Sequence, residues 1–118
     1  MNSPSSRNEL QKLRDHLRKF ALEREWDQFH SPKNLAIALS VEASELLEHF
    51  QWLTEEQSRS LPLTEVRKEM GDVLLYLIRL ADKLDIDLVE AAQSKLLENA
   101  EKYPVEKARG TSKKYTEL

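Results

Sequence analysis

Apolar residues recur along the chain at spacings of three and four, the period of one face of an α-helix. A capping serine, Ser5 or Ser6, precedes the first such series. The apolar positions of that series are Leu10, Leu13, Leu17, Phe20 and Ala21. They predict a first helix that ends at about Phe29. Because no segment shows sustained alternation of apolar and polar residues between turn signals, the sequence predicts an all-α fold.

Capping residues mark the start of a second helix and of a short turn. Ser31 is followed by Pro32 at the first helical position, which is a favourable start, and the predicted helix runs to about Phe50. Thr54 and Gln57 have the spacing of a capping box, so we expect a short turn there.

Two more helices are predicted after this turn. Pro62 interrupts the chain before a third helix from about Thr64 to Leu84. Asp87 and Glu90 repeat the capping-box spacing and start a fourth helix, which we expect to stop near Tyr103.

The four helices predict one domain over residues 1–104 with a four-helix-bundle-like arrangement, followed by a polar loop or tail over residues 105–118. A domain this small buries a limited share of its surface, so we expect oligomerisation to complete the core. On the third helix, Leu74, Leu75 and Ile78 are the apolar residues left for that contact. The buried stripe predicted for the same helix is Val66, Met70, Val73, Leu77, Leu80 and Leu84.

Composition excludes several classes of function. With 18 basic and 21 acidic residues and a net charge of −3, the chain has no general attraction for nucleic acid or anionic membranes. The absence of cysteine excludes disulfides and zinc-thiolate sites and fits a cytoplasmic location. No apolar run is long enough to span a bilayer, and two glycines cannot build a glycine-rich phosphate loop.

Two pairs of acidic residues lie on unexpected faces of the second and third helices. Glu42 and Glu45 border the leucine stripe of the second helix, and Glu69 and Asp72 border that of the third. Each pair is three residues apart, which places both side chains on one helix face. Antiparallel neighbouring helices would bring the four carboxylates together. Such a cluster needs cations, and oxygen ligands suit Mg²⁺ or Mn²⁺.

Two other interpretations of these acids are less favourable. Most acids at a helix border simply pair with Lys or Arg, but two matched pairs weaken that interpretation. Di-iron bundles use Glu-x-x-His, and none of His16, His30 and His49 has a glutamate three residues before it, so a hard cation is preferred to iron.

Gly71 lies inside the second acidic pair. A glycine in a helix interior costs about 1 kcal/mol relative to alanine, so its presence indicates tight helix packing or access to the site.

The two motifs Glu-x-x-Glu and Glu-x-x-Asp, with this gap between them, resemble the signature of the all-α nucleoside triphosphate pyrophosphohydrolases, the MazG-like family. The likeness covers most of the chain from about residue 20 and is greatest to the dCTP pyrophosphatase branch. It is carried by the segments "EREWDQFHSPKNLAIAL", "ELLEHFQW", "EMGDVLLYLIRLAD", "SKLLENAEKYP" and "SKKYTEL".

The resemblance implies Mg²⁺-dependent hydrolysis of a deoxynucleoside triphosphate, dCTP or a close relative first, to the monophosphate and pyrophosphate. Such a reaction removes surplus or unwanted nucleotides. It also implies a homo-oligomer, a dimer or a tetramer. The residues that match the family's catalytic metal ligands are Glu42, Glu45, Glu69 and Asp72.

The resemblance further assigns residues to nucleotide binding. For the base, the matching positions are Trp26, His30, Trp52, Tyr76 and Asn99; for the triphosphate, they are Lys95, Lys102 and Tyr103. Aromatic faces stack on any base, whereas a polar contact from His30 or Asn99 would discriminate among bases. Two alternatives stay open: the same chemistry on dUTP, on modified nucleotides or on a broad set, and a non-catalytic helical interaction module.

Overall fold

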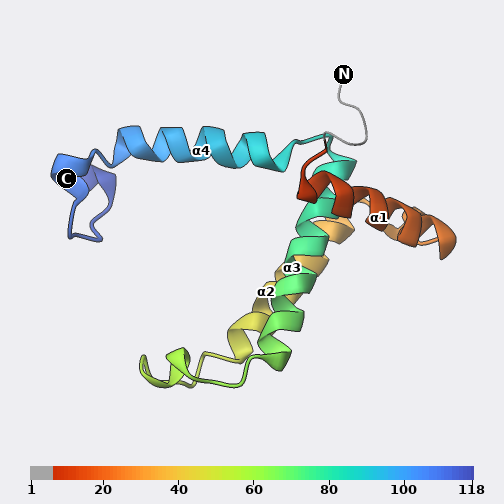
Figure 1. The fold of residues 1–118 in the computed structure, drawn as a ribbon, viewed down its shortest axis with the longest axis horizontal. Coiled ribbons are helices and arrows are strands. Elements are labelled where there is room, and N and C mark those ends of the chain that lie inside the picture. The colour runs from red at the N-terminus through yellow and green to blue at the C-terminus, as the bar shows by residue number, and fades with distance from the viewer. Residues whose placement is uncertain (1–6) are drawn as a thin grey trace. The chain divides into compact units, whose positions relative to one another are not determined.

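The computed structural model describes residues 7–118, which contain helices and no strand (Figure 1). The all-α prediction is therefore confirmed. By internal contacts the chain divides into two units, one ending at Ile86 and one from Asp87 to Leu118. The α-helices of the first unit are α1 (Glu9–Glu23), α2 (Pro32–Glu48) and α3 (Thr64–Lys83), with short 3₁₀ turns η2 (Asp27–Phe29) and η3 (Gln57–Arg59) between them.

Helix α1 differs from its prediction at both ends. The expected caps Ser5 and Ser6 lie outside the described residues, and Asn8 caps the helix in a capping box with Gln11. The helix stops at Glu23 because Glu25 takes a left-handed conformation with φ 54°, and the N–H of Trp26 donates back to the carbonyl of Ala21 over 2.9 Å. The apolar spacing that continues to Phe29 belongs to the separate turn η2.

The predicted starts of α2 and α3 are confirmed. Ser31 caps α2 by accepting from the N–H of Asn34, with Pro32 at the first position. The capping box of Thr54 and Gln57 is present, with hydrogen bonds of 3.0 and 3.2 Å. Helix α3 begins at the predicted Thr64.

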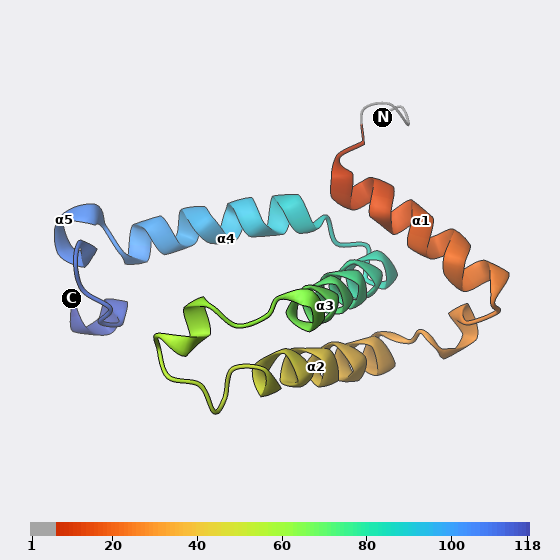
Figure 2. The ribbon, with the colours of Figure 1, turned by 60° about the horizontal axis from the view of Figure 1, so that its bottom comes forward.

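Helices α2 and α3 form an antiparallel hairpin and lie side by side in both views (Figures 1 and 2). Helix α1 packs against α3 as well. The buried apolar residues of the described chain come from all three helices and are Ala21, Leu35, Val66, Ile78 and Ala81. This unit therefore has a small core, centred on α3.

The predicted buried stripe of α3 is wrong in part. Met70, Leu77 and Leu84 are exposed, whereas Ile78, expected on the outer surface, is 3% exposed. Helix α3 contacts α1 as well as α2, which accounts for the burial of Ile78 outside the predicted stripe. Met70, Leu77 and Leu84 are exposed because neither neighbouring helix covers them in the single chain.

The second unit begins with α4 (Leu88–Lys102), which Asp87 caps by accepting from the N–H of Glu90. Its end before Tyr103 agrees with the prediction. The prediction of loop for residues 105–118 is wrong in part, since α5 (Val105–Ala108) and the 3₁₀ turn η4 (Tyr115–Glu117) form there. The Tyr115 ring packs edge-to-face on Tyr103 at 6.1 Å, which holds the end of the tail to the end of α4. A domain boundary after residue 104 stays a prediction.

Over residues 7–118, none of the helices combines the length and the apolar character that crossing a bilayer requires.

Candidate active site

The antiparallel hairpin brings acidic residues of α2 and α3 together, as the sequence predicts. Glu42 on α2 and Glu69 and Asp72 on α3 each offer a carboxylate oxygen, and these oxygens lie within 4.8 Å of one another. Glu45 is not part of this close group, but it interacts with Glu42 one turn earlier on α2. Three of the four predicted ligands thus converge, and the fourth lies beside them.

The carboxylates of this cluster lack cationic partners. Among the described residues, no Lys or Arg forms an ion pair with Glu42, Glu45, Glu69 or Asp72. The nearest basic group is His49, whose Nε2 lies 3.9 Å from Oε1 of Glu69. The alternative that these acids merely pair with Lys or Arg at a helix border is therefore wrong.

Two oxygens of the cluster are buried without a hydrogen bond, Oε2 of Glu42 and Oε2 of Glu69. Burial, the hydrogen bond and charge of Glu45, and the charge of Asp72 raise the pKa of Glu42 from 4.5 to about 7. Unpartnered buried carboxylate oxygens are costly and need a counter-charge. The donor set fits a hard divalent cation such as Mg²⁺, which prefers carboxylate oxygens to nitrogen or sulfur.

A cavity of about 220 Å³ adjoins the cluster. Its lining is largely aromatic and apolar, and it contains three of the predicted base-binding residues, Trp26, His30 and Tyr76. Asp72 lines this cavity and also belongs to the carboxylate cluster. An apolar cavity with a few polar groups next to a hard-cation site has the features of a nucleotide-binding site.

The other predicted nucleotide-binding residues lie elsewhere. Trp52 follows the end of α2, is 86% exposed and does not line the cavity. The four remaining residues are in the second unit, on α4 or at its end, namely Lys95, Asn99, Lys102 and Tyr103. There, Lys95 and Lys102 pair with Glu98 at 3.4 and 3.1 Å. Their contact with a nucleotide stays a prediction.

Gly71 lies between Glu69 and Asp72 in α3. A Cβ atom built there meets nothing within 4 Å. Within residues 7–118, the tight helix packing that the sequence indicated at Gly71 is therefore absent.

The chain is similar to known proteins. Residues 37–118, more than half of the chain, match the MazG-like family. The chain belongs to this family. It is 43% identical over 114 residues to dCTP pyrophosphatase 1 of Mus musculus, covering 92% of this chain and 67% of that protein. The Homo sapiens dCTP pyrophosphatase 1 is 41% identical with the same coverage.

A solved structure supports the same fold. The crystal structure of a pyrophosphatase from Archaeoglobus fulgidus is 37% identical and superimposes with a TM-score of 0.77, covering 88% of this chain and 98% of that one. The MazG-like all-α fold predicted from the carboxylate motifs is therefore confirmed.

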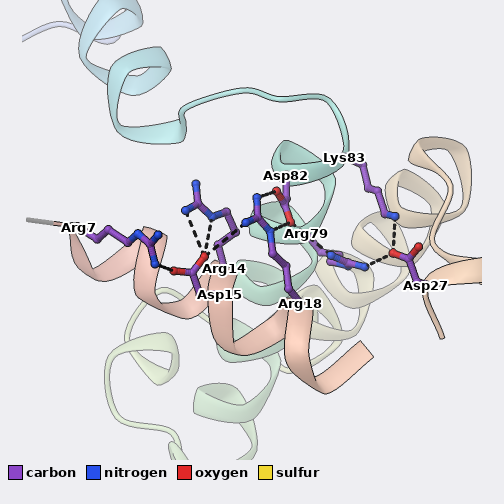
Figure 3. A network of polar contacts seen from close by, with 8 residues as sticks. All are labelled: Arg7, Arg14, Asp15, Arg18, Asp27, Arg79, Asp82 and Lys83. Atoms are coloured by element: carbon purple, nitrogen blue, oxygen red, sulfur yellow. Dashed lines mark hydrogen bonds and ion pairs between the residues drawn. The ribbon is translucent and has the colours of Figure 1, made fainter. Parts of the chain in front are cut away.

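The sequence interpretation missed a network of charged residues in this MazG-like chain (Figure 3). At its centre is Arg79 of α3, which is 6% exposed. Its guanidinium donates to Asp27 over 2.6 Å, to Asp82 over 3.3 Å and to Nδ1 of His30 over 3.2 Å. Lys83 also binds Asp27, at 2.5 Å. An arginine within the apolar run "VLLYLIRLAD" was the signal available in the sequence, because a buried arginine needs several partners.

The network continues along α1. Arg18 binds Asp82 there and lies 3.6 Å from Asp15. Asp15 also pairs with Arg7 and, at 3.2 Å, with Arg14 (Figure 3). The network therefore ties α1 and η2 to the C-terminal half of α3, which carries one wall of the cavity.

His30 connects this network to the cavity. Burial, together with the positive charges of Arg79 and Lys83, lowers the pKa of His30 below its ordinary value of 6.5. His30 is therefore neutral at physiological pH, when its ring can both accept and donate a hydrogen bond.

Proposed function

We propose that this protein hydrolyses a deoxynucleoside triphosphate, dCTP or a close relative first, to the monophosphate and pyrophosphate. The observation that carries the proposal is the position of Asp72, which belongs to the carboxylate cluster and also lines the aromatic cavity. A base held in the cavity would place its phosphates toward the cluster. The dCTP pyrophosphatases among the relatives and the archaeal pyrophosphatase support the same chemistry.

The residues that would hold Mg²⁺, or Mn²⁺, are Glu42, Glu45, Glu69 and Asp72. The unpartnered oxygens of Glu42 and Glu69 support this assignment. When bound, the cation supplies positive charge that neutralises the triphosphate and makes the attacking water more acidic. A carboxylate of the α2 pair would accept the proton of that water, and Glu42 of this pair has a raised pKa. Attack at the α-phosphorus then breaks the bond to the β-phosphate and releases pyrophosphate.

Base and phosphate contacts are divided between two groups of residues. In the cavity, the rings of Trp26 and Tyr76 stack on the base, and His30 makes a polar contact to its edge. The family resemblance also assigns Asn99 of α4 to the base. It assigns Lys95, Lys102 and Tyr103 to the phosphates, which the acidic cluster alone would repel.

We also propose that a second copy of the chain covers the outer face of the α2–α3 hairpin. Large apolar side chains are exposed on both helices, Ile37, Val41 and Leu47 on α2 and Leu74 and Leu77 on α3. Exposed apolar surface beside so small a core is typical of a chain whose stability depends on assembly. A homodimer or a homotetramer would bury it.

The test is incubation of the pure protein with single deoxynucleoside triphosphates and Mg²⁺, with separate assays of pyrophosphate and orthophosphate. We expect equal amounts of monophosphate and pyrophosphate, with dCTP or a methylated or halogenated cytosine analogue used best. Asp72→Asn should abolish turnover, whereas Glu65→Gln, a change at an exposed acid of the same helix, should not. Release of orthophosphate, or no product with any nucleotide, would contradict the proposal.

A further inference from the structure

Arg79 has a fixed position beside His30. The two terminal nitrogens of its guanidinium donate to carboxylates, one to Asp27 over 2.6 Å and the other to Asp82 over 3.3 Å. These two contacts fix the plane of the guanidinium and therefore the direction of its Nε–H group. This Nε–H donates to Nδ1 of His30 over 3.2 Å. Arginine has five N–H donors and no acceptor, and it stays protonated in proteins. The direction of this hydrogen bond is therefore fixed.

The hydrogen bond determines which ring nitrogen of His30 carries the proton. Nδ1 must be unprotonated to accept from Arg79, so the neutral ring carries its hydrogen on Nε2. Protonation of Nδ1 would be opposed by the Nε–H donor of Arg79 and by the positive charges of Arg79 and Lys83. Within residues 7–118, no hydrogen bond of the chain uses Nε2 of His30, although the ring lines the aromatic cavity. The Nε2–H group is thus left for a ligand.

We propose that Arg79 is a positioning residue that fixes His30 as the neutral Nε2–H tautomer, so that the base cavity presents a hydrogen-bond donor to its ligand. This inference rests on the proposed function, which it deepens by naming the hydrogen bond that would select the base. The edge of cytosine presents two neighbouring acceptors, N3 and O2, whereas the N3 of uracil and thymine carries a hydrogen. A fixed donor directed at N3 therefore fits cytosine better than either of them.

A purely structural role for Arg79 must be separated from this one, because the same side chain links η2 to α3 through Asp27. Arg79→Met removes the donors and keeps an apolar chain in the buried position. The two carboxylates retain partners in this variant, since Asp27 still binds Lys83 and Asp82 still binds Arg18. Arg18→Met is the matched control, because Arg18 belongs to the same network and does not contact His30.

The first measurement is independent of catalysis. ¹⁵N-labelled histidine side chains are recorded by long-range ¹H–¹⁵N correlation, with His30 assigned by its absence in His30→Gln. We expect unprotonated Nδ1 and protonated Nε2 in the native protein and in Arg18→Met, and a mixture of tautomers in Arg79→Met. A hydrogen on Nδ1 in the native protein, or an unchanged single tautomer in Arg79→Met, would overturn the inference.

The second measurement asks whether Arg79 acts through His30. Loss of one directed donor should raise the KM for dCTP roughly tenfold in Arg79→Met, with kcat changed little. Adding Arg79→Met to His30→Phe should then cause little further change, whereas equal effects in both backgrounds would contradict the inference. Arg79→Lys, which keeps the charge but not the planar donor, should behave like Arg79→Met. If the native protein hydrolyses no nucleotide, the proposed function fails, while the tautomer spectrum still decides the role of Arg79.

Discussion

Arg18 on α1 donates two hydrogen bonds to Asp82 on α3, from Nε over 2.8 Å and from Nη2 over 2.5 Å. The two residues are 64 positions apart in the sequence, and the Asp82 side chain is 10% exposed. This pair is therefore a long-range tie between the helix that closes one side of the cavity and the helix that carries Asp72 and Arg79.

The pair makes stability depend on pH in a defined direction. The hydrogen bonds from Arg18 lower the pKa of Asp82 below its ordinary value of 3.8. A carboxylate with a lowered folded-state pKa stabilises the fold above its unfolded pKa, and that contribution is lost as pH falls through the folded value. Arg18→Met should reduce the free energy of unfolding by about 1 kcal/mol near neutral pH, since the arginine is half exposed. The loss should shrink as pH falls below about 4.

Urea denaturation at neutral and acid pH measures both effects. Lys12→Met is the control, because Lys12 forms an exposed pair with Glu9 in the same helix. It should change the free energy of unfolding by a few tenths of a kcal/mol, of the order expected for such pairs. An Arg18→Met effect that does not vary with pH would contradict the role given to Asp82.

The carboxylate cluster should respond to Mg²⁺ in the absence of substrate. A cation that binds only the folded state raises the melting temperature, and above the dissociation constant this rise grows with the logarithm of the cation concentration. Glu69→Gln should abolish most of this rise, and its metal-free melting temperature should not fall, because the change neutralises a half-buried carboxylate whose Oε2 has no hydrogen-bond partner. Differential scanning fluorimetry with Mg²⁺ and with EDTA checks this. A native-like response to Mg²⁺ in Glu69→Gln would show that the site lies elsewhere.

The aromatic wall of the cavity should contribute to substrate affinity. Trp26 lines the cavity and packs edge-to-face on Phe20 at 5.6 Å, so its ring is oriented before a base binds. Loss of one stacking ring costs about 1–3 kcal/mol per base, so Trp26→Ala should raise KM roughly tenfold or more. Trp26→Phe should retain most of the affinity. Steady-state kinetics with dCTP measure both variants. An unchanged KM in Trp26→Ala would show that the cavity does not bind the base.

Gly71 gives a prediction about stability rather than catalysis. A methyl group at this position meets nothing within 4 Å, and alanine is favoured over glycine in a helix interior by about 1 kcal/mol. Gly71→Ala should therefore raise the free energy of unfolding by roughly that amount, as measured by chemical denaturation. A loss of stability would instead show that a second copy of the chain packs on this part of α3.

Local patterns in the sequence predict the elements well and their ends less well. Ser31 with Pro32, and Thr54 with Gln57, are caps that depend only on neighbouring residues, and both are present. The end of α1 is decided instead by the left-handed Glu25, which no period of apolar residues reveals. Helix α2 ends at Glu48, so the position of Trp52 beyond it does not follow from a helical period.

In the candidate site too, local sequence patterns predict some features, and others depend on the folded chain. The spacing of three within each acidic pair is a local property, and the hairpin then brings Glu42, Glu69 and Asp72 together. Arg79 could not be found this way, since its role depends on partners 49 and 52 positions away, His30 and Asp27. Its neighbours in sequence are apolar, and only the folded chain shows which groups surround it.

The small core of the first unit bears on how this protein behaves in a dilute solution. Its buried apolar side chains are few, and large ones on α2 and α3 face solvent in the single chain. If assembly supplies the missing contacts, the folded fraction depends on protein concentration. Turnover per molecule should then fall as the protein is diluted below the dissociation constant of the oligomer, which ultracentrifugation can determine. The specific activity of the protein would then depend on the protein concentration.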